Sequence, residues 1–179
     1  SGNSYTLSGS PEAEGTFNYT VTTTGNTCLA TTTTGTITVL PNHTLTLTSA
    51  PATTTQTLCI NTPLVNITYT FGGGATGLNV TGLPTGVSET VSGNNLTISG
   101  SPSVSGNFSY TITTTGNGCI SASATGSITV NPDHTLVLAS APGTVNQQAC
   151  INTAITDVVF TLGGGATGAT VSGLPAGVT

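Results

Sequence analysis

The chain has 179 residues, no lysine or arginine, five acidic residues and a pI of about 4.2. Nucleic acids and anionic membrane surfaces are recognised through lysine and arginine, so this composition argues against both as partners. The missing lysines also exclude a phosphate-binding P-loop and lysine-based covalent chemistry.

Charged residues make up 3% of the chain, far below the roughly 25% of an ordinary soluble domain. Threonine is abundant and there are 24 glycines, a composition that favours strands and turns over helices. Apolar residues recur in strand-like alternation, which argues against disorder. We therefore expect an all-β protein with essentially no helix.

An ungapped repeat with a shift of 91 residues runs along most of the chain. Corresponding pairs include Phe17 and Phe108, Tyr19 and Tyr110, Cys28 and Cys119, His43 and His134, and Cys59 and Cys150. Such self-similarity is the mark of a repeat architecture.

Proline-containing segments at 40–42 and 131–133 each follow a strand-like ending, and we place the unit boundaries there. Residues 1–41 are then the C-terminal half of one repeat, 42–132 a complete repeat, and 133–179 the N-terminal half of the next. We expect a segment of a long tandem array. The alternative is a subunit that polymerises by completing its neighbour's half-domain.

Within the complete repeat, alternating apolar residues predict a series of short strands. In chain order they lie at residues 43–49, 56–60, 65–71, 78–80, 87–92, 96–98, 108–112 and 128–130. Seven or eight strands in this length, separated by turn residues, predict tandem immunoglobulin-like β-sandwich domains of about 91 residues each. The predicted inward-facing residues are Ile67, Tyr69, Phe71, Leu96, Ile98, Phe108, Tyr110, Ile112, Ile128 and Val130.

The four cysteines form no CxxC motif and no cluster with histidine, so they favour disulfides in an oxidising, extracellular compartment over zinc. Cys59 and Cys119 belong to one repeat, and a bond between them would contribute about 4 kcal/mol by closing a long loop. Cys28 and Cys150 would then pair with neighbouring units outside this sequence. The alternative joins Cys28 to Cys59 and Cys119 to Cys150.

No pattern in the chain predicts a catalytic, metal or cofactor site, and we expect no enzyme activity. His43 and His134 each follow a linker and are interpreted as strand-start residues. Glu12 and Glu14 are replaced by serines in the second copy, so they indicate a solvated turn. One boundary carries Asp133 where the other has asparagine, and a calcium-stiffened junction, which needs several carboxylates, is not expected.

Asn-x-Ser/Thr acceptor motifs recur along the chain. Asn18 and Asn107 correspond between the repeats, and we predict them as glycosylation sites. We expect sugars on threonine or serine more than on asparagine, because a surface so poor in charge would gain solubility from them.

GLPTGV (82–87), LTISGSP (96–102) and SGNFSYTITTTG (105–116) resemble the immunoglobulin-like repeat of large bacterial cell-surface proteins. With CINT at 59–62 and GNGC at 116–119, the chain looks most similar to tandem repeats in giant exported adhesins of Bacteroidetes-type bacteria. The resemblance implies an immunoglobulin-like sandwich, used in such proteins as stalk, spacer or adhesin.

The predicted function is a structural repeat segment of an extracellular bacterial surface stalk or filament. Its expected partners are adjacent repeats or other copies of itself, because uncharged strand edges without lysine leave side-by-side pairing open. The alternative is an adhesive module that recognises a glycan or a cell surface. All eight phenylalanines and tyrosines can be placed on inward faces, which weakens that alternative. A third hypothesis is a spacer attached to an enzyme elsewhere in the chain.

Overall fold

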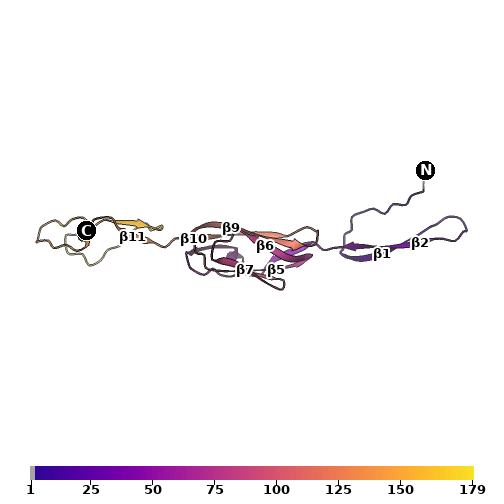
Figure 1. Ribbon diagram of the computed structural model, residues 1–179, viewed down its shortest axis with the longest axis horizontal. Helices are drawn as coiled ribbons and strands as arrows, with labels where there is room; N and C mark the ends of the chain where they lie inside the picture. Colours follow the sequence, from indigo (N-terminus) through magenta and orange to yellow (C-terminus); the bar gives the residue numbers. More distant parts are fainter. Residues whose placement is uncertain (1–2) are drawn as a thin grey trace.

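The computed structural model describes residues 3–179, and within them it contains β-strands, two short 3-10 helices and no α-helix. Three parts follow one another along the long axis (Figure 1). They are the N-terminal segment (residues 3–41), the central sandwich (residues 43–131) and the C-terminal segment (residues 133–179). The predicted all-β class is confirmed.

The central sandwich consists of two four-stranded sheets. The first has the order β3 (His43–Leu47), β5 (Ile67–Gly73), β8 (Asn95–Gly100) and β7 (Val87–Ser92). The second has the order β4 (Thr55–Cys59), β10 (Ser123–Asn131), β9 (Gly106–Gly116) and β6 (Ala75–Thr81). The 3-10 helix η1 (Pro51–Thr54) connects β3 in the first sheet to β4 in the second.

The strand pairs within both sheets are antiparallel with one exception, the parallel pair of β4 and β10. Its register sets Gln56 beside Ile128 and Cys59 beside Asn131. Because the two strands run the same way, they end at the same end of the sandwich.

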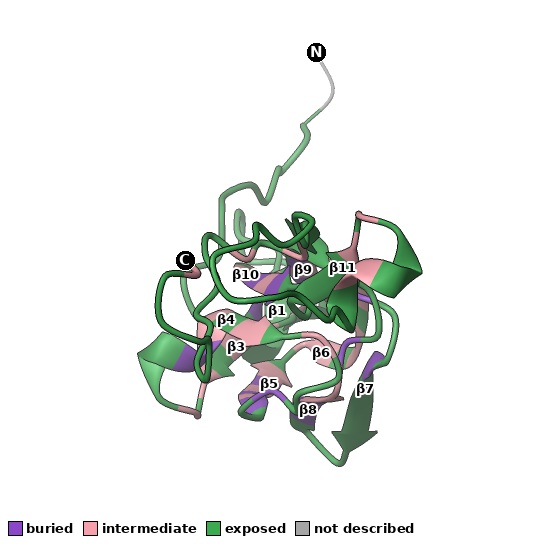
Figure 2. Ribbon diagram, turned by 90° about the vertical axis from the view of Figure 1, so that its left-hand side faces the viewer, coloured by how far each residue is buried: buried purple, intermediate pink, exposed green. Residues whose placement is uncertain are grey.

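The core lies between the two sheets and draws buried residues from both; in the end-on view, buried segments are visible on strands of each sheet (Figure 2). Every residue of the predicted inward set is buried except Phe108, which is half-buried. Tyr110 is fully buried, and its hydroxyl donates to the Thr54 carbonyl at 3.3 Å. Gly126 lies beneath this ring, and a Cβ there would collide with the Tyr110 hydroxyl.

The two end segments repeat parts of the sandwich. In the N-terminal segment, β1 (Gly15–Thr22) and β2 (Thr32–Val39) form a hairpin in the register of β9 and β10. In the C-terminal segment, β11 (Thr135–Leu138), η2 (Pro142–Val145) and β12 (Phe160–Gly163) repeat β3, η1 and β5.

The apolar faces of the end segments are uncovered, because each segment carries only part of the strands of a unit. Phe17 and Ile37 are 47% and 49% exposed, whereas Ile128, the counterpart of Ile37, is fully buried. The inward placement predicted for the aromatic residues is therefore seen in the central sandwich. It fails in the end segments, where the exposed aromatic residues are Tyr5, Phe17, Tyr19 and Phe160.

Candidate functional site at the repeat junction

A densely hydrogen-bonded polar site lies where the N-terminal segment meets the central sandwich. His43 begins β3 and is only 8% exposed. Its Nδ1 lies 2.9 Å from Oγ1 of Thr114, and its Nε2 lies 3.1 Å from Oδ1 of Asn117. Oδ1 of Asn117 can only accept, so Nε2 of the ring carries a proton. The Thr114 hydroxyl lies within hydrogen-bond distance of both Nδ1 and the Ala122 carbonyl, the latter at 3.1 Å, and its single proton can be donated to only one of them at a time. Both partners come from β9 and its following loop, far along the chain.

Residues 116–121, from the last residue of β9 into the loop that precedes β10, are called the junction loop below, and Asn117 is the central contact residue of this segment. The Oδ1 atom of Asn117 also accepts from the backbone N–H of Cys119 at 3.1 Å. Its Nδ2 donates to the Pro41 carbonyl at 3.2 Å, and its backbone N–H donates to the Gly74 carbonyl at 3.2 Å. One asparagine thus ties the junction loop to the linker and to the turn between β5 and β6.

Two hydrogen bonds donated by backbone N–H groups complete the junction. The N–H of His43 donates to the Ile120 carbonyl at 3.0 Å, and the N–H of Ile120 donates to Oδ1 of Asn42 at 3.4 Å. On the other side, the linker runs so close to Gly73 that a Cβ there would collide with the Asn42 carbonyl. The linker is therefore enclosed between the junction loop and the β5–β6 turn, and bending it would break several hydrogen bonds.

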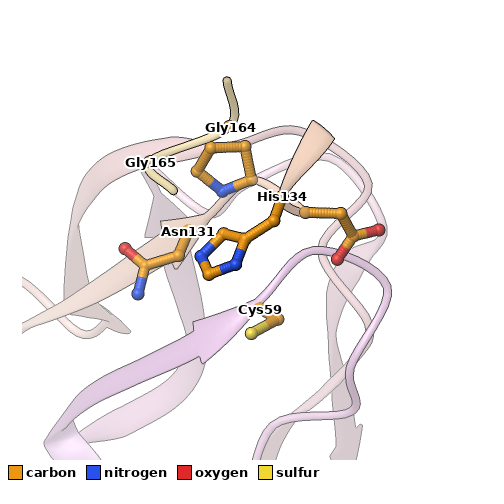
Figure 3. Close-up of a pocket in the computed structure, with 7 residues that line it drawn as sticks. Cys59, Asn131, His134, Gly164 and Gly165 are labelled. Carbon is orange, nitrogen blue, oxygen red and sulfur yellow. The ribbon is translucent and has the colours of Figure 1, made fainter. Parts of the chain in front are cut away.

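At the other end of the sandwich, the corresponding linker borders an open hollow of about 490 Å³. The hollow is lined by Cys59, Asn131, Pro132, Asp133, His134, Gly164 and Gly165. The side chain of His134 points into it, between Asn131 and Cys59 (Figure 3). Unlike His43, His134 is exposed.

All four cysteines are unpaired, so the bond predicted between Cys59 and Cys119 is absent from this structure. Cys59 lies beside Asn131 where β4 and β10 end, whereas Cys119 lies in the loop that precedes β10. β10 is nine residues long, so at about 3.3 Å per residue the two ends are about 26 Å apart. Disulfide geometry requires Cα atoms about 4.4–6.8 Å apart, so the sandwich holds these two cysteines too far from each other to pair.

The remaining predicted residues lie apart from any site. Glu12 and Glu14 are exposed near β1, and the predicted glycosylation sites Asn18 and Asn107 are exposed on β1 and β9. Among residues 3–179, no three His, Cys, Asp or Glu side chains come together as metal ligands would. Over the same residues, no helix is long and apolar enough to cross a membrane.

Sequence reasoning identified His43 as a strand-start residue but missed its partners Thr114 and Asn117. A signal for them was present, because Thr23 and Asn26 stand at the same positions in the first copy. In a chain this rich in threonine, glycine and asparagine, such matches did not stand out from the background composition.

No protein-family model matches the chain, and no curated protein matches it. Solved structures similar to the chain include domains 4 and 5 of the S-layer protein SbsC (17% identity, TM-score 0.37, covering 56% of this chain and 58% of that one). Others are the extracellular domain of protocadherin GammaB4 (14% identity, TM-score 0.41, covering 82% and 26%) and protocadherin gammaB7 EC3-6 (16% identity, TM-score 0.42, covering 81% and 39%). The chain thus spans 58% or less of the length of each of these structures, and at these scores the likeness carries no weight for function.

Proposed function

We propose that this chain is a structural segment of an extracellular bacterial surface stalk or filament, built from tandem immunoglobulin-like domains with boundaries near residues 41 and 132. The observation that supports it best is the enclosed linker at residues 40–43. Tandem domains on a short linker move relative to each other unless contacts hold them. Here the contacts of His43 and Asn117 hold the linker against the domain that it enters.

The composition supports the same role. A chain without cations and with few acids has little electrostatic repulsion between copies placed side by side. The edge strands of the two sheets, β3 and β7 in one and β4 and β6 in the other, carry no lysine that would block pairing with a further strand. Adjacent repeats and other copies of the chain are therefore the proposed partners.

An adhesive module for glycans is the second candidate function. Sugar-binding sites usually display exposed aromatic side chains, whose flat apolar faces pack against the rings of the sugar. In the central sandwich Tyr69, Phe71 and Tyr110 are buried in the core and Phe108 is half-buried. A glycan array probed with the chain tests this candidate, and saturable binding to one sugar class would favour it over the structural role.

Location and assembly can be tested on the protein in its source cells. Antibodies against the central sandwich are expected to label intact cells, and electron microscopy of the purified protein is expected to show straight rods or filaments with a regular axial repeat. Labelling only after lysis, or particles that bend freely between beads, would contradict the proposal.

A further inference from the structure

The hollow at Cys59 repeats a place that is occupied elsewhere in the same chain. Apart from Cys59, the residues that line it are the counterparts, 91 positions on, of residues 40–43, 73 and 74. At the first junction those residues hold the junction loop. A Cβ on Gly74 would collide with the Asn117 amide, whereas a Cβ on Gly165 would meet nothing within 4 Å. The hollow is thus a site with the same lining and no loop in it.

The chain carries a second copy of the junction loop at residues 25–30, and this copy has the same internal hydrogen bonds. Asn26 Oδ1 accepts from the N–H of Cys28 at 3.1 Å, as Asn117 does from Cys119. Thr23 Oγ1 accepts from the N–H of Thr31 at 2.8 Å, the same bond that Thr114 makes with Ala122. Thr23, just before this exposed loop, and Asn26 within it therefore already make the local hydrogen bonds that their counterparts Thr114 and Asn117 make beside His43.

The rest of the two end segments is complementary as well. Residues 133–179 correspond to 42–88 of the complete unit, and residues 3–41 correspond to 94–132. The C-terminal segment supplies counterparts of β3 and β5, and the N-terminal segment supplies counterparts of β9 and β10. The exposed faces around Phe160 and Phe17 are those that would pack against each other in one sandwich. Burying such faces is the main driving force of association.

Comparing the two junctions shows that a junction loop bound in the hollow would bring its cysteine to the Asn131 carbonyl, beside Cys59. At the first junction, the Cys119 thiol lies 3.7 Å from the Leu40 carbonyl oxygen. The counterpart of Leu40 is Asn131, whose carbonyl accepts from the N–H of Ile60 at 2.8 Å and whose Cα is paired with that of Cys59. A loop in the hollow would bring its cysteine to the Asn131 carbonyl, next to Cys59. Neighbouring strands are about 4.8 Å apart, a separation that a disulfide spans.

We propose that the hollow beside Cys59 binds residues 25–30 of a second copy of this chain, and that Cys59 of one copy forms a disulfide with Cys28 of the other. This proposal rests on the proposed function, in which domains pack in tandem, and it identifies a second copy of the chain as the partner. His134 then contacts Thr23 and Asn26 of the second copy, as His43 contacts their counterparts. The same packing brings Cys150 of the first copy next to Cys119 of the second.

The bond forms by thiol–disulfide exchange with a small-molecule disulfide such as glutathione disulfide. The Cys59 thiolate attacks this disulfide and releases one glutathione thiolate, which takes up a proton. The Cys28 thiolate of the second copy then attacks the Cys59 sulfur of the mixed disulfide and releases the second glutathione. The two protein thiols lose two electrons and two protons, and one glutathione disulfide is reduced to two thiols.

The test uses the full chain with Cys119→Ser and Cys150→Ser, so that only Cys28 and Cys59 remain. In a glutathione redox buffer, non-reducing electrophoresis is expected to show a ladder of oligomers. Mass spectrometry after chymotryptic digestion, needed because trypsin has no site in this chain, is expected to identify the link between Cys28 and Cys59. A chain that stays monomeric, a Cys28–Cys59 link within one chain, or mainly Cys28–Cys28 and Cys59–Cys59 links would each overturn the proposal.

Specific binding is tested separately in a chain with all four cysteines replaced by serine. Sedimentation is expected to show head-to-tail association that His134→Ala and Asn26→Ala each weaken about tenfold or more, and that Asn79→Ala, an exposed residue on β6, leaves unchanged. Equal association for all variants, or none for the parent chain, would overturn the binding site. Neither result would change the cell-surface labelling, so failure here is distinguishable from failure of the proposed function.

Discussion

Nδ1 of His43 lies 2.9 Å from the hydroxyl oxygen of Thr114, a residue 71 positions further along the chain. The contact joins the first residue of β3, in one sheet, to β9 in the other. It also fixes the point at which the linker meets the sandwich. The junction is therefore part of the folded domain, and its hydrogen bonds contribute to the domain's own stability.

Replacing His43 by alanine is expected to lower the free energy of unfolding by about 1–3 kcal/mol, because Thr114 and Asn117 lose a buried partner. Urea unfolding of the chain measures the effect. His134→Ala is the matched control, since His134 is exposed and is expected to change stability by less than about 0.5 kcal/mol. Equal effects of the two substitutions on a monomeric chain would contradict this view of the junction.

A second matched pair tests the location of the core. Ile128→Ala removes a fully buried side chain and is expected to lower the free energy of unfolding by about 2–5 kcal/mol. Ile37→Ala removes the residue at the same repeat position, where the side chain is half exposed, and is expected to cost well under half as much in the monomer. If Ile37→Ala were as costly as Ile128→Ala at concentrations that exclude association, the N-terminal segment would have to be covered within its own chain.

Alkaline pH is expected to destabilise the central sandwich. Burial raises the pKa of Tyr69 and of Tyr110 above the usual value of 10, and the neighbouring Tyr69 hydroxyl raises that of Tyr110 further. Above about pH 10 the unfolded chain therefore releases protons that the folded chain retains, so the free energy of unfolding falls as pH rises.

Urea unfolding between pH 8 and pH 11 measures this slope, in a chain whose four cysteines are replaced by serine so that their thiols do not titrate. Tyr110→Phe is expected to flatten the slope, at the cost of its hydrogen bond to Thr54. Stability that is independent of pH over this range would show that the two hydroxyls ionise equally in the folded and unfolded chain.

Glycosylation is expected at Asn18 and Asn107, both exposed on a strand surface. Peptides that contain these residues, prepared from the source organism, are expected to be heavier than their amino-acid sequences. Peptides with the bare sequence mass at both positions would exclude the asparagine sites, and an intact mass matching 17.5 kDa for this segment would exclude sugars on threonine and serine too.

Much of the central sandwich could be predicted from local pattern. Alternation along residues 67–71 and 108–112 identifies strands and their buried face, because a strand presents every second side chain to the core. The segment between the first two predicted strands, for which no element was predicted, forms a short 3-10 helix at 51–54. Phe108 was expected in the core but lies near its edge, where β9 begins and its cover is incomplete.

The 91-residue repeat, the all-β class and most of the core follow from the amino-acid pattern, because strand periodicity and turn residues are local properties. Three features emerge only in the folded chain: β4 runs parallel to β10, Cys59 and Cys119 therefore lie at opposite ends of the sandwich, and the junction loop covers the linker at His43. These depend on which strands pair and in which direction. Pairing between distant strands leaves no local mark in the chain, since it is chosen by the packing of the whole sandwich.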